Sequence, residues 1–237
     1  MTAPLDLPAL ESLGRTHAFS ADQVSALARL LAALGSEPDP PTKFTEPGDA
    51  VRGHLADSLA GLAVPELVRA DRIADIGAGA GFPGLALATA LPGSQVDLIE
   101  ASARRCALIA RLIAAAELPN ARALARRAEA LAAAEGRVAY AAVTARAVAS
   151  LPVLVEYAAP LLARDGVLVA WKGRRQGAEE GAGERAAAQV GLAPARVLAV
   201  TPFAGAHSRH LHVFIKTAET PASFPRRPGI AVKRPLG

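Results

Sequence analysis

A run of glycines after a short apolar segment constrains this chain more than any other feature. The run reads Asp75-Ile-Gly-Ala-Gly-Ala-Gly-Phe-Pro-Gly84, and the segment before it, Arg72-Ile-Ala-Asp-Ile76, has the length and branched residues of a strand. Pro83 stands where a helix would begin, and residues 85–91 carry that helix to a Pro92-Gly93 stop. A strand that turns through glycines into a helix predicts an α/β fold whose backbone passes close to a ligand.

The alternation of strands and helices continues along the chain. Ser102 can cap a helix whose inward face carries Cys106, Ile109 and Leu112. Further strands are predicted at 95–99, 138–143, 166–171, 196–201 and 210–216. Strands that alternate with helices predict a mostly parallel sheet, which we expect to have seven strands and helices on both faces.

The chain of 237 residues divides into three predicted parts. Residues 1–69 form a helical extension, in which Ser20 is the N-cap and Gly35 the stop of one helix. Residues 70–217 hold the α/β domain. Residues 218–237 form a basic, proline-rich tail that we expect to be extended or disordered in isolation.

Composition excludes several classes of protein. Hydrophobic residues make up 51% of the chain, yet charged residues interrupt every stretch of the roughly 20 apolar residues that a membrane span needs. The start Met-Thr-Ala-Pro-Leu-Asp does not resemble a signal peptide, so we expect a cytoplasmic protein. Cys106 is the only cysteine, which excludes an intramolecular disulfide and a thiolate zinc site. The net charge of +4 is compatible with a polyanionic partner.

Two cofactor templates fit the glycine run. Gly79, Gly81 and Gly84 satisfy the dinucleotide pattern G-x-G-x-x-G. The acid-x-G-x-G-x-G pattern of Rossmann-like class I methyltransferases is satisfied by Asp75, Gly77, Gly79 and Gly81. A dinucleotide would place its anionic pyrophosphate beside the Asp75 carboxylate, whereas S-adenosylmethionine carries two cationic groups that a carboxylate attracts. The sequence therefore favours S-adenosylmethionine, with an NAD-dependent oxidoreductase as an alternative.

Acidic residues farther along extend this cofactor prediction. Glu100 ends the second predicted strand, where a carboxylate can accept hydrogen bonds from both ribose hydroxyls. Arg127-Ala-Glu129 lies in the segment where a Rossmann-like enzyme contacts adenine, although spacing alone gives only a weak indication there.

Several motifs in one order resemble a known family, the small-subunit ribosomal RNA guanine-N7 methyltransferases (RsmG, also called glucose-inhibited division protein B). The resemblance covers most of the chain and includes Phe82-Pro-Gly84, where other methyltransferases vary. The matching segments are His54-Leu-Ala-Asp-Ser-Leu59, Asp75–Leu85, Arg127-Ala-Glu129, Ala145-Arg-Ala-Val-Ala-Ser150, Trp171-Lys-Gly173, Arg209–Ile215 and Phe224–Leu236. One departure is Lys43-Phe-Thr45, where the family usually has Asn-Leu-Thr.

The resemblance implies cofactor contacts and a substrate. The implied contacts to S-adenosylmethionine are Gly77, Phe82, Ala128, Glu129 and Arg146. The implied substrate is a guanine in the decoding-region loop of 16S rRNA, presented as free rRNA, an assembly intermediate or the small ribosomal subunit. Guanine N7 has a lone pair and no proton, so methylation there needs no general base, and we predict no catalytic proton-transferring residue.

Basic residues are the candidates for RNA contact, because arginine pairs with phosphate and stacks on bases. Arg146 and Lys172 follow predicted strands at the cofactor edge of the sheet, and Arg209 precedes the last strand. Arg226 and Arg227 charge the tail. His210 and His212 alternate on one strand without a nearby carboxylate or thiol, so we predict no metal site.

Three other functions stay open at this point. A methyltransferase of the same fold could act on another RNA or on a small molecule. The chain could be the NAD-dependent oxidoreductase considered above, or an RNA-binding protein with a vestigial pocket. Nothing in the sequence argues for more than a monomer.

Overall fold

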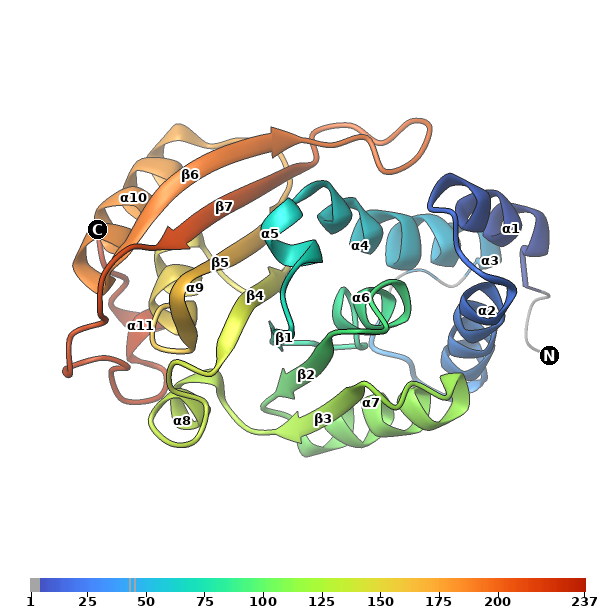
Figure 1. Ribbon diagram of the computed structural model, residues 1–237, viewed down its shortest axis with the longest axis horizontal. Helices are drawn as coiled ribbons and strands as arrows, with labels where there is room; N and C mark the ends of the chain where they lie inside the picture. Colours follow the sequence, from blue (N-terminus) through green and yellow to red (C-terminus); the bar gives the residue numbers. More distant parts are fainter. Residues whose placement is uncertain (1–4, 43, 45) are drawn as a thin grey trace.

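The computed structural model describes residues 5–42, 44 and 46–237, and its centre is one twisted sheet (Figure 1). The strand order is β3-β2-β1-β4-β5-β7-β6. All neighbouring pairs are parallel except those made by β7. The strands are β1 (Arg72–Ile76), β2 (Gln95–Glu100), β3 (Ala121–Ala125), β4 (Tyr140–Arg146), β5 (Leu162–Lys172), β6 (Leu192–Ala199) and β7 (His210–Lys216). This arrangement confirms the predicted fold class.

Helices cover both faces of the sheet because its side chains alternate between two apolar clusters. On β5, Val167 and Val169 belong to one cluster, and Leu168 and Ala170 to the other. The first face carries α6 (Gly84–Ala90), α7 (Ala103–Ala116) and the N-terminal helices. The second carries α8 (Ala128–Ala132), α9 (Leu151–Ala158), α10 (Gly177–Val190) and α11 (Ile230–Lys233).

The N-terminal segment is helical up to Val68, as predicted. Ser20 caps α2 through a reciprocal capping box with Gln23, which satisfies two backbone donors at the helix start. No helix in the described ranges is long and apolar enough to cross a membrane. The elements are α1 (Leu7–Thr16), α2 (Ala21–Ser36), α3 (Pro47–Ala50), the π-helix η1 (Val51–Ala56), α4 (Asp57–Leu59), the 3₁₀ helix η2 (Ala60–Ala63) and α5 (Pro65–Val68).

The C-terminal tail, which we expect to be extended or disordered in isolation, packs against the α/β domain in the folded protein. The Arg137 guanidinium donates to the carbonyl oxygens of Thr220 and Phe224, at 3.1 and 2.9 Å. The short helix α11 buries Ala231 in the cluster that includes α9. These contacts come from segments distant in the sequence, so the tail's own composition does not reveal them.

The strand order locates the place where a ligand can bind. From β1 the chain moves outward to β3 and then returns to β4 on the other side of β1. The helical connections on the two sides of β1 therefore cover opposite faces of the sheet. This leaves a crevice at the carboxyl ends of β1 and β4. Both Gly77, after β1, and Arg146, at the end of β4, lie at this edge.

Candidate functional site

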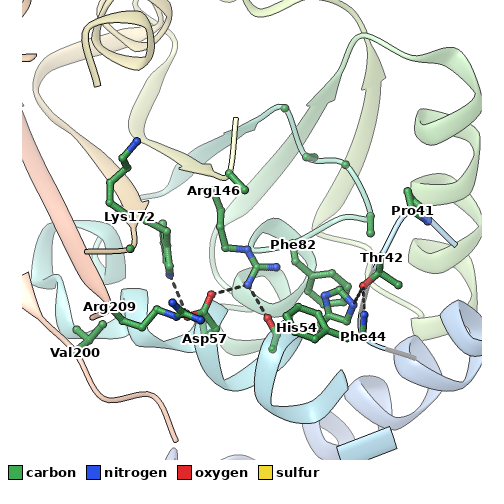
Figure 2. Close-up of a pocket in the computed structure, with 18 of the residues that line it drawn as sticks. Pro41, Thr42, Phe44, His54, Asp57, Phe82, Arg146, Lys172, Val200 and Arg209 are labelled. Atoms are coloured by element: carbon green, nitrogen blue, oxygen red, sulfur yellow. Dashed lines mark hydrogen bonds and ion pairs between the residues drawn. The ribbon is translucent and has the colours of Figure 1, made fainter. Parts of the chain in front are cut away.

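A cavity of about 530 Å³ opens at the carboxyl ends of the strands. The glycine loop after β1 lines it, and the opposite wall comes from η1 and the start of α4 (Figure 2). Residues from β5 and from the segment before β7 complete the lining. The cavity therefore lies where the N-terminal helices meet the switch point of the sheet.

The glycine loop has a backbone that only glycine adopts without strain at several positions. Gly77, Gly79 and Gly81 have φ angles of +66°, +59° and +96°. The Gly77 N–H donates to the Ile99 carbonyl at 2.8 Å, which joins the loop to the end of β2. A Cβ on Gly77 would lie 2.8 Å from a methyl group of Val148. The loop is thus held close to its neighbours while its backbone faces the cavity.

Asp75 lies beneath the loop, outside the cavity lining, and is fully buried. Its carboxylate accepts a hydrogen bond from the Gly84 N–H at 2.9 Å and one from the Thr144 hydroxyl at 3.0 Å. Burial raises the pKa of Asp75 to about 7, although these two hydrogen bonds and the Arg146 charge oppose the rise. Asp75 therefore ties β1, β4 and the start of α6 together.

Glu100 accepts hydrogen bonds on the other side of the loop. One carboxylate oxygen accepts from the Gly79 N–H at 3.0 Å and the other from the Ser102 N–H at 2.8 Å. The side chain is buried beside the cavity and is not among its lining residues. Glu100 occupies the predicted place at the end of β2.

An aromatic wall faces the loop. The rings of His54 and Phe82 stack with centroids 4.4 Å apart, and Phe44 meets His54 edge-on at 5.1 Å. The Thr42 hydroxyl lies 2.8 Å from His54 Nε2. Burial, with the nearby Arg146 charge, lowers the pKa of His54 to about 3. His54 is therefore a neutral imidazole at physiological pH.

Cations line the opposite part of the cavity. Arg146 donates from Nη1 to an Asp57 carboxylate oxygen at 2.9 Å and to the Gly53 carbonyl at 2.9 Å. Arg209 Nε lies 3.4 Å from the second Asp57 oxygen. Lys172 pairs with Glu179 at 2.6 Å. The cavity thus combines a glycine cradle, an aromatic wall and guanidinium groups, a set that suits a ligand with both a ring system and an anionic group.

Two polar side-chain atoms of residues in the cavity wall are buried. In the part of the chain that the structure describes, only His54 Nδ1 and Asp57 Oδ1 are buried side-chain atoms without a hydrogen-bond partner. Both residues line the cavity. Asp57 Oδ1 faces Arg209 Nε at 3.4 Å, and the His54 ring contacts Phe44 and Phe82.

The cavity brings together some of the predicted site residues. It is lined by Gly77, Gly79, Phe82, Arg146, Lys172 and Arg209. Gly81 belongs to the loop without lining the cavity, Asp75 and Glu100 support the loop from outside, and Ala128 and Glu129 begin α8 and are buried. Glu129 accepts a hydrogen bond from the Gly229 N–H at 3.0 Å. Lys43, which stands where the family pattern has Asn, and the retained Thr45 lie outside the described residues.

Sequence reasoning did not assign the rest of the lining to the site. The segments His54–Leu59 and Trp171–Gly173 were singled out only as family motifs, and that resemblance was the available signal. The unassigned lining residues are Pro41, Thr42, Phe44, Gly53, His54, Asp57, Ala78, Ala80, Arg105, Ala147, Trp171, Gly173, Val200 and His210.

The two tail arginines that were predicted to contact RNA differ in their surroundings. Arg226 pairs with Glu156, whose side chain is only 2% exposed, and also donates to the Arg234 carbonyl at 2.9 Å. Arg227 is exposed. We expect Arg226→Ala to lower the free energy of unfolding by about 2–3 kcal/mol, because it leaves a buried carboxylate without its partner. Denaturant unfolding measures this loss.

Arg227→Ala is the matched control, one residue away on the same tail. We expect it to change the free energy of unfolding by less than about 0.5 kcal/mol. Equal losses in the two variants would contradict an anchoring role for the pair of Arg226 and Glu156.

Histidines near β7 do not gather as metal ligands. His210 Nδ1 lies 2.8 Å from the Gly173 carbonyl oxygen, and His212 Nε2 lies 4.0 Å from Glu180. Among the residues that the structure describes, no group of three His, Cys, Asp or Glu side chains is placed to hold a metal ion.

Several solved structures share the fold of this chain. A predicted O-methyltransferase from Agrobacterium tumefaciens is 25% identical, with a TM-score of 0.52 over 69% of this chain and 81% of its own. Fibrillarin from Aeropyrum pernix, solved with natively bound S-adenosyl-L-methionine, is 15% identical, with a TM-score of 0.51 over 67% and 72%. At that identity the fibrillarin likeness concerns the fold alone.

Sequence relatives cover most of the chain. The relative from Chloroflexus aggregans is 43% identical over 78% of each protein, and that from Deinococcus radiodurans is 40% identical over 88% of this chain and 84% of its own. Both are named ribosomal RNA small subunit methyltransferase G. The model of the GidB family, described as rRNA small subunit methyltransferase G, matches residues 22–211. The chain therefore belongs to the rRNA small subunit methyltransferase G family.

Proposed function

We propose that this protein transfers a methyl group from S-adenosylmethionine to N7 of a guanine in the decoding-region loop of 16S rRNA. The observation that carries the proposal is the cavity at the switch point, where a glycine loop with positive φ angles faces guanidinium groups in a member of this family. The name of the family supports the rRNA substrate. The chemistry of the cavity supports the cofactor.

S-adenosylmethionine supplies a methyl group on a sulfonium and carries an adenosine and an amino-acid end. We assign Gly77, Gly79 and Phe82 to contacts with it, because they line the cavity. Arg146 presents a cation to a carboxylate. Asp75, Gly81 and Glu100 keep the loop in place, and Glu100 is the nearest acid to serve the ribose. Ala128 and Glu129 follow β3 at the same edge of the sheet, where we assign them to the adenine.

The protein's residues need only orient the base. Guanine N7 is already a nucleophile, so alignment with the methyl group supplies the main catalytic effect. Of the histidines in the lining, His54 has a pKa of about 3, so its imidazole is neutral and is too weak a base to take a proton at physiological pH. We therefore assign no catalytic acid or base.

The cavity mouth and the tail are the proposed RNA contacts. Lys172 and Arg209 line the mouth, and Arg227 is exposed on the tail, while we assign Arg226 to tail anchoring. We propose that residues 70–217 carry the chemistry, that residues 1–69 complete the cavity and that residues 218–237 extend the RNA surface. We also propose that the protein works as a cytoplasmic monomer on the small subunit or an assembly intermediate.

Calorimetry with S-adenosylmethionine and with NAD tests the cofactor assignment. We expect S-adenosylmethionine to bind in the micromolar range and NAD to show no heat of binding, because Asp75 already occupies the Gly84 N–H at the start of α6, a donor that a pyrophosphate would need. Tighter binding of NAD would contradict the assignment and favour the oxidoreductase alternative.

A further inference from the structure

One carboxylate of the N-terminal helices holds two arginines of the α/β domain (Figure 2). Asp57 Oδ2 accepts from Arg146 at the end of β4, and Oδ1 faces Arg209 before β7. The Asp57 backbone is itself fixed, since its carbonyl accepts from Trp171 Nε1 on β5 at 2.8 Å. Through its side chain and its carbonyl oxygen, Asp57 thus contacts three separate segments of the α/β domain.

Both acceptors of Arg146 belong to the N-terminal segment. Nη1 donates to the Gly53 carbonyl and to Asp57, which are four residues apart along η1 and α4. The side chains of Arg146 and Asp57 are only 15% and 14% exposed, so water can replace little of this pairing. The direction of the guanidinium is therefore set by the N-terminal helices as well as by β4.

This arrangement leaves several N–H donors of the Arg146 guanidinium available to a ligand. A guanidinium has five N–H donors, and the bonds described above use those on Nη1. Among the described residues, Nε and Nη2 of Arg146 have no hydrogen-bond partner, and the residue lines the cavity. Those donors can serve an anionic group of a ligand.

We propose that Asp57 is a positioning residue. It holds the Arg146 guanidinium so that the Nε and Nη2 donors of Arg146 are available to the carboxylate of S-adenosylmethionine. The inference rests on the proposed function and deepens it, because it makes the N-terminal helices part of the cofactor site. Through its second oxygen Asp57 also restrains Arg209, whose side chain is 44% exposed at the mouth. The same residue thus links the cofactor end of the cavity to the side where RNA is proposed to enter.

Two substitutions of Asp57 distinguish its positioning of Arg146 from the effect of its negative charge. Asp57→Asn keeps an acceptor for Arg146 and removes the negative charge, whereas Asp57→Ala removes both. Calorimetry on the full chain should find S-adenosylmethionine bound about 30-fold more weakly by Asp57→Ala and within about fivefold of wild type by Asp57→Asn. If only the negative charge of Asp57 mattered, its removal would leave the Arg146 cation unpaired in both variants. Both variants would then bind S-adenosylmethionine more tightly than the wild type, and that result would overturn the proposal.

A double-mutant cycle tests whether Asp57 acts through Arg146. In an Arg146→Met background, Asp57→Ala should weaken binding by less than about threefold. The same 30-fold loss in that background, or unchanged affinity in the single Asp57→Ala variant, would overturn the proposal. If the wild-type protein binds no S-adenosylmethionine, the proposed function fails and the inference fails with it.

Asp97 provides a matched control for loss of a buried carboxylate. It pairs with Arg122 at 2.9 Å, accepts from the Tyr140 hydroxyl at 2.8 Å and does not line the cavity. Asp97→Ala should lower the melting temperature and leave the affinity for S-adenosylmethionine unchanged. An equal loss of affinity in this variant would mean that Asp57→Ala reports only general destabilisation, which would contradict positioning.

Discussion

Replacement of Gly77 by valine is expected to reduce methyl transfer by at least about 1,000-fold, equivalent to about 4 kcal/mol. Gly77 has a φ of +66°, a conformation that a β-branched residue adopts only at high cost. Its Cβ would also lie 2.8 and 3.0 Å from the two methyl groups of Val148. The loop must therefore move, and the part of the cavity that it lines moves with it.

Gly205→Val is the control for backbone strain alone. Gly205 has a φ of +82° in the segment between β6 and β7, and a Cβ there meets no atom within 4 Å. We expect this variant to keep most of its methyl transfer and its affinity for S-adenosylmethionine. If Gly77→Val bound the cofactor as tightly as the wild type and retained activity, the glycine loop would not be the cofactor site.

The replacement Asp75→Asn is expected to remove a pH dependence of about 4 kcal/mol from the free energy of unfolding. The pKa of Asp75 is about 7 in the folded protein, well above the ordinary aspartate value of 3.8, because the carboxyl group is buried. Between these values the folded state keeps a proton that the unfolded state loses. This contribution to stability is complete below about pH 4 and disappears as the pH rises through 7.

Asparagine imitates the protonated form at this position. Its oxygen can accept from the Gly84 N–H while its amide donates to the Thr144 hydroxyl oxygen, which can turn its own proton away. Chemical denaturation of both proteins between about pH 4.5 and 8.5 measures the difference. We expect the wild type to lose stability relative to Asp75→Asn as the pH rises, and a constant difference would contradict the raised pKa.

Local signals in the sequence predicted most of the fold. Ser20 and Ser102 cap helices as expected, because a side-chain oxygen followed by an apolar stripe specifies a helix start without distant contacts. The glycine run and the branched strands β1 and β2 were also located correctly. β3 was not placed, because its sequence Ala-Arg-Ala-Leu-Ala is typical of a helix and only pairing with β2 makes it a strand.

The site was less predictable because its walls come from distant parts of the chain. Asp57 and Arg146 are 89 residues apart, and neither position alone indicates that they meet. His54 was noted only as part of a family motif, yet it stacks on Phe82 of the glycine loop. Such contacts follow from how the N-terminal helices pack on the sheet, which residue spacing does not encode.

Methyl transfer from radiolabelled S-adenosylmethionine to small ribosomal subunits tests the central claim most directly. The subunits come from a strain that lacks the family enzyme, so the target guanine is unmodified. N7 methylation leaves a cationic ring that borohydride reduces and aniline cleaves, which maps the site. We predict label in one decoding-region guanine of 16S rRNA, with strand cleavage there, and no label with Gly77→Val. Tight cofactor binding without label in the rRNA, or label at an atom other than N7, would contradict the account.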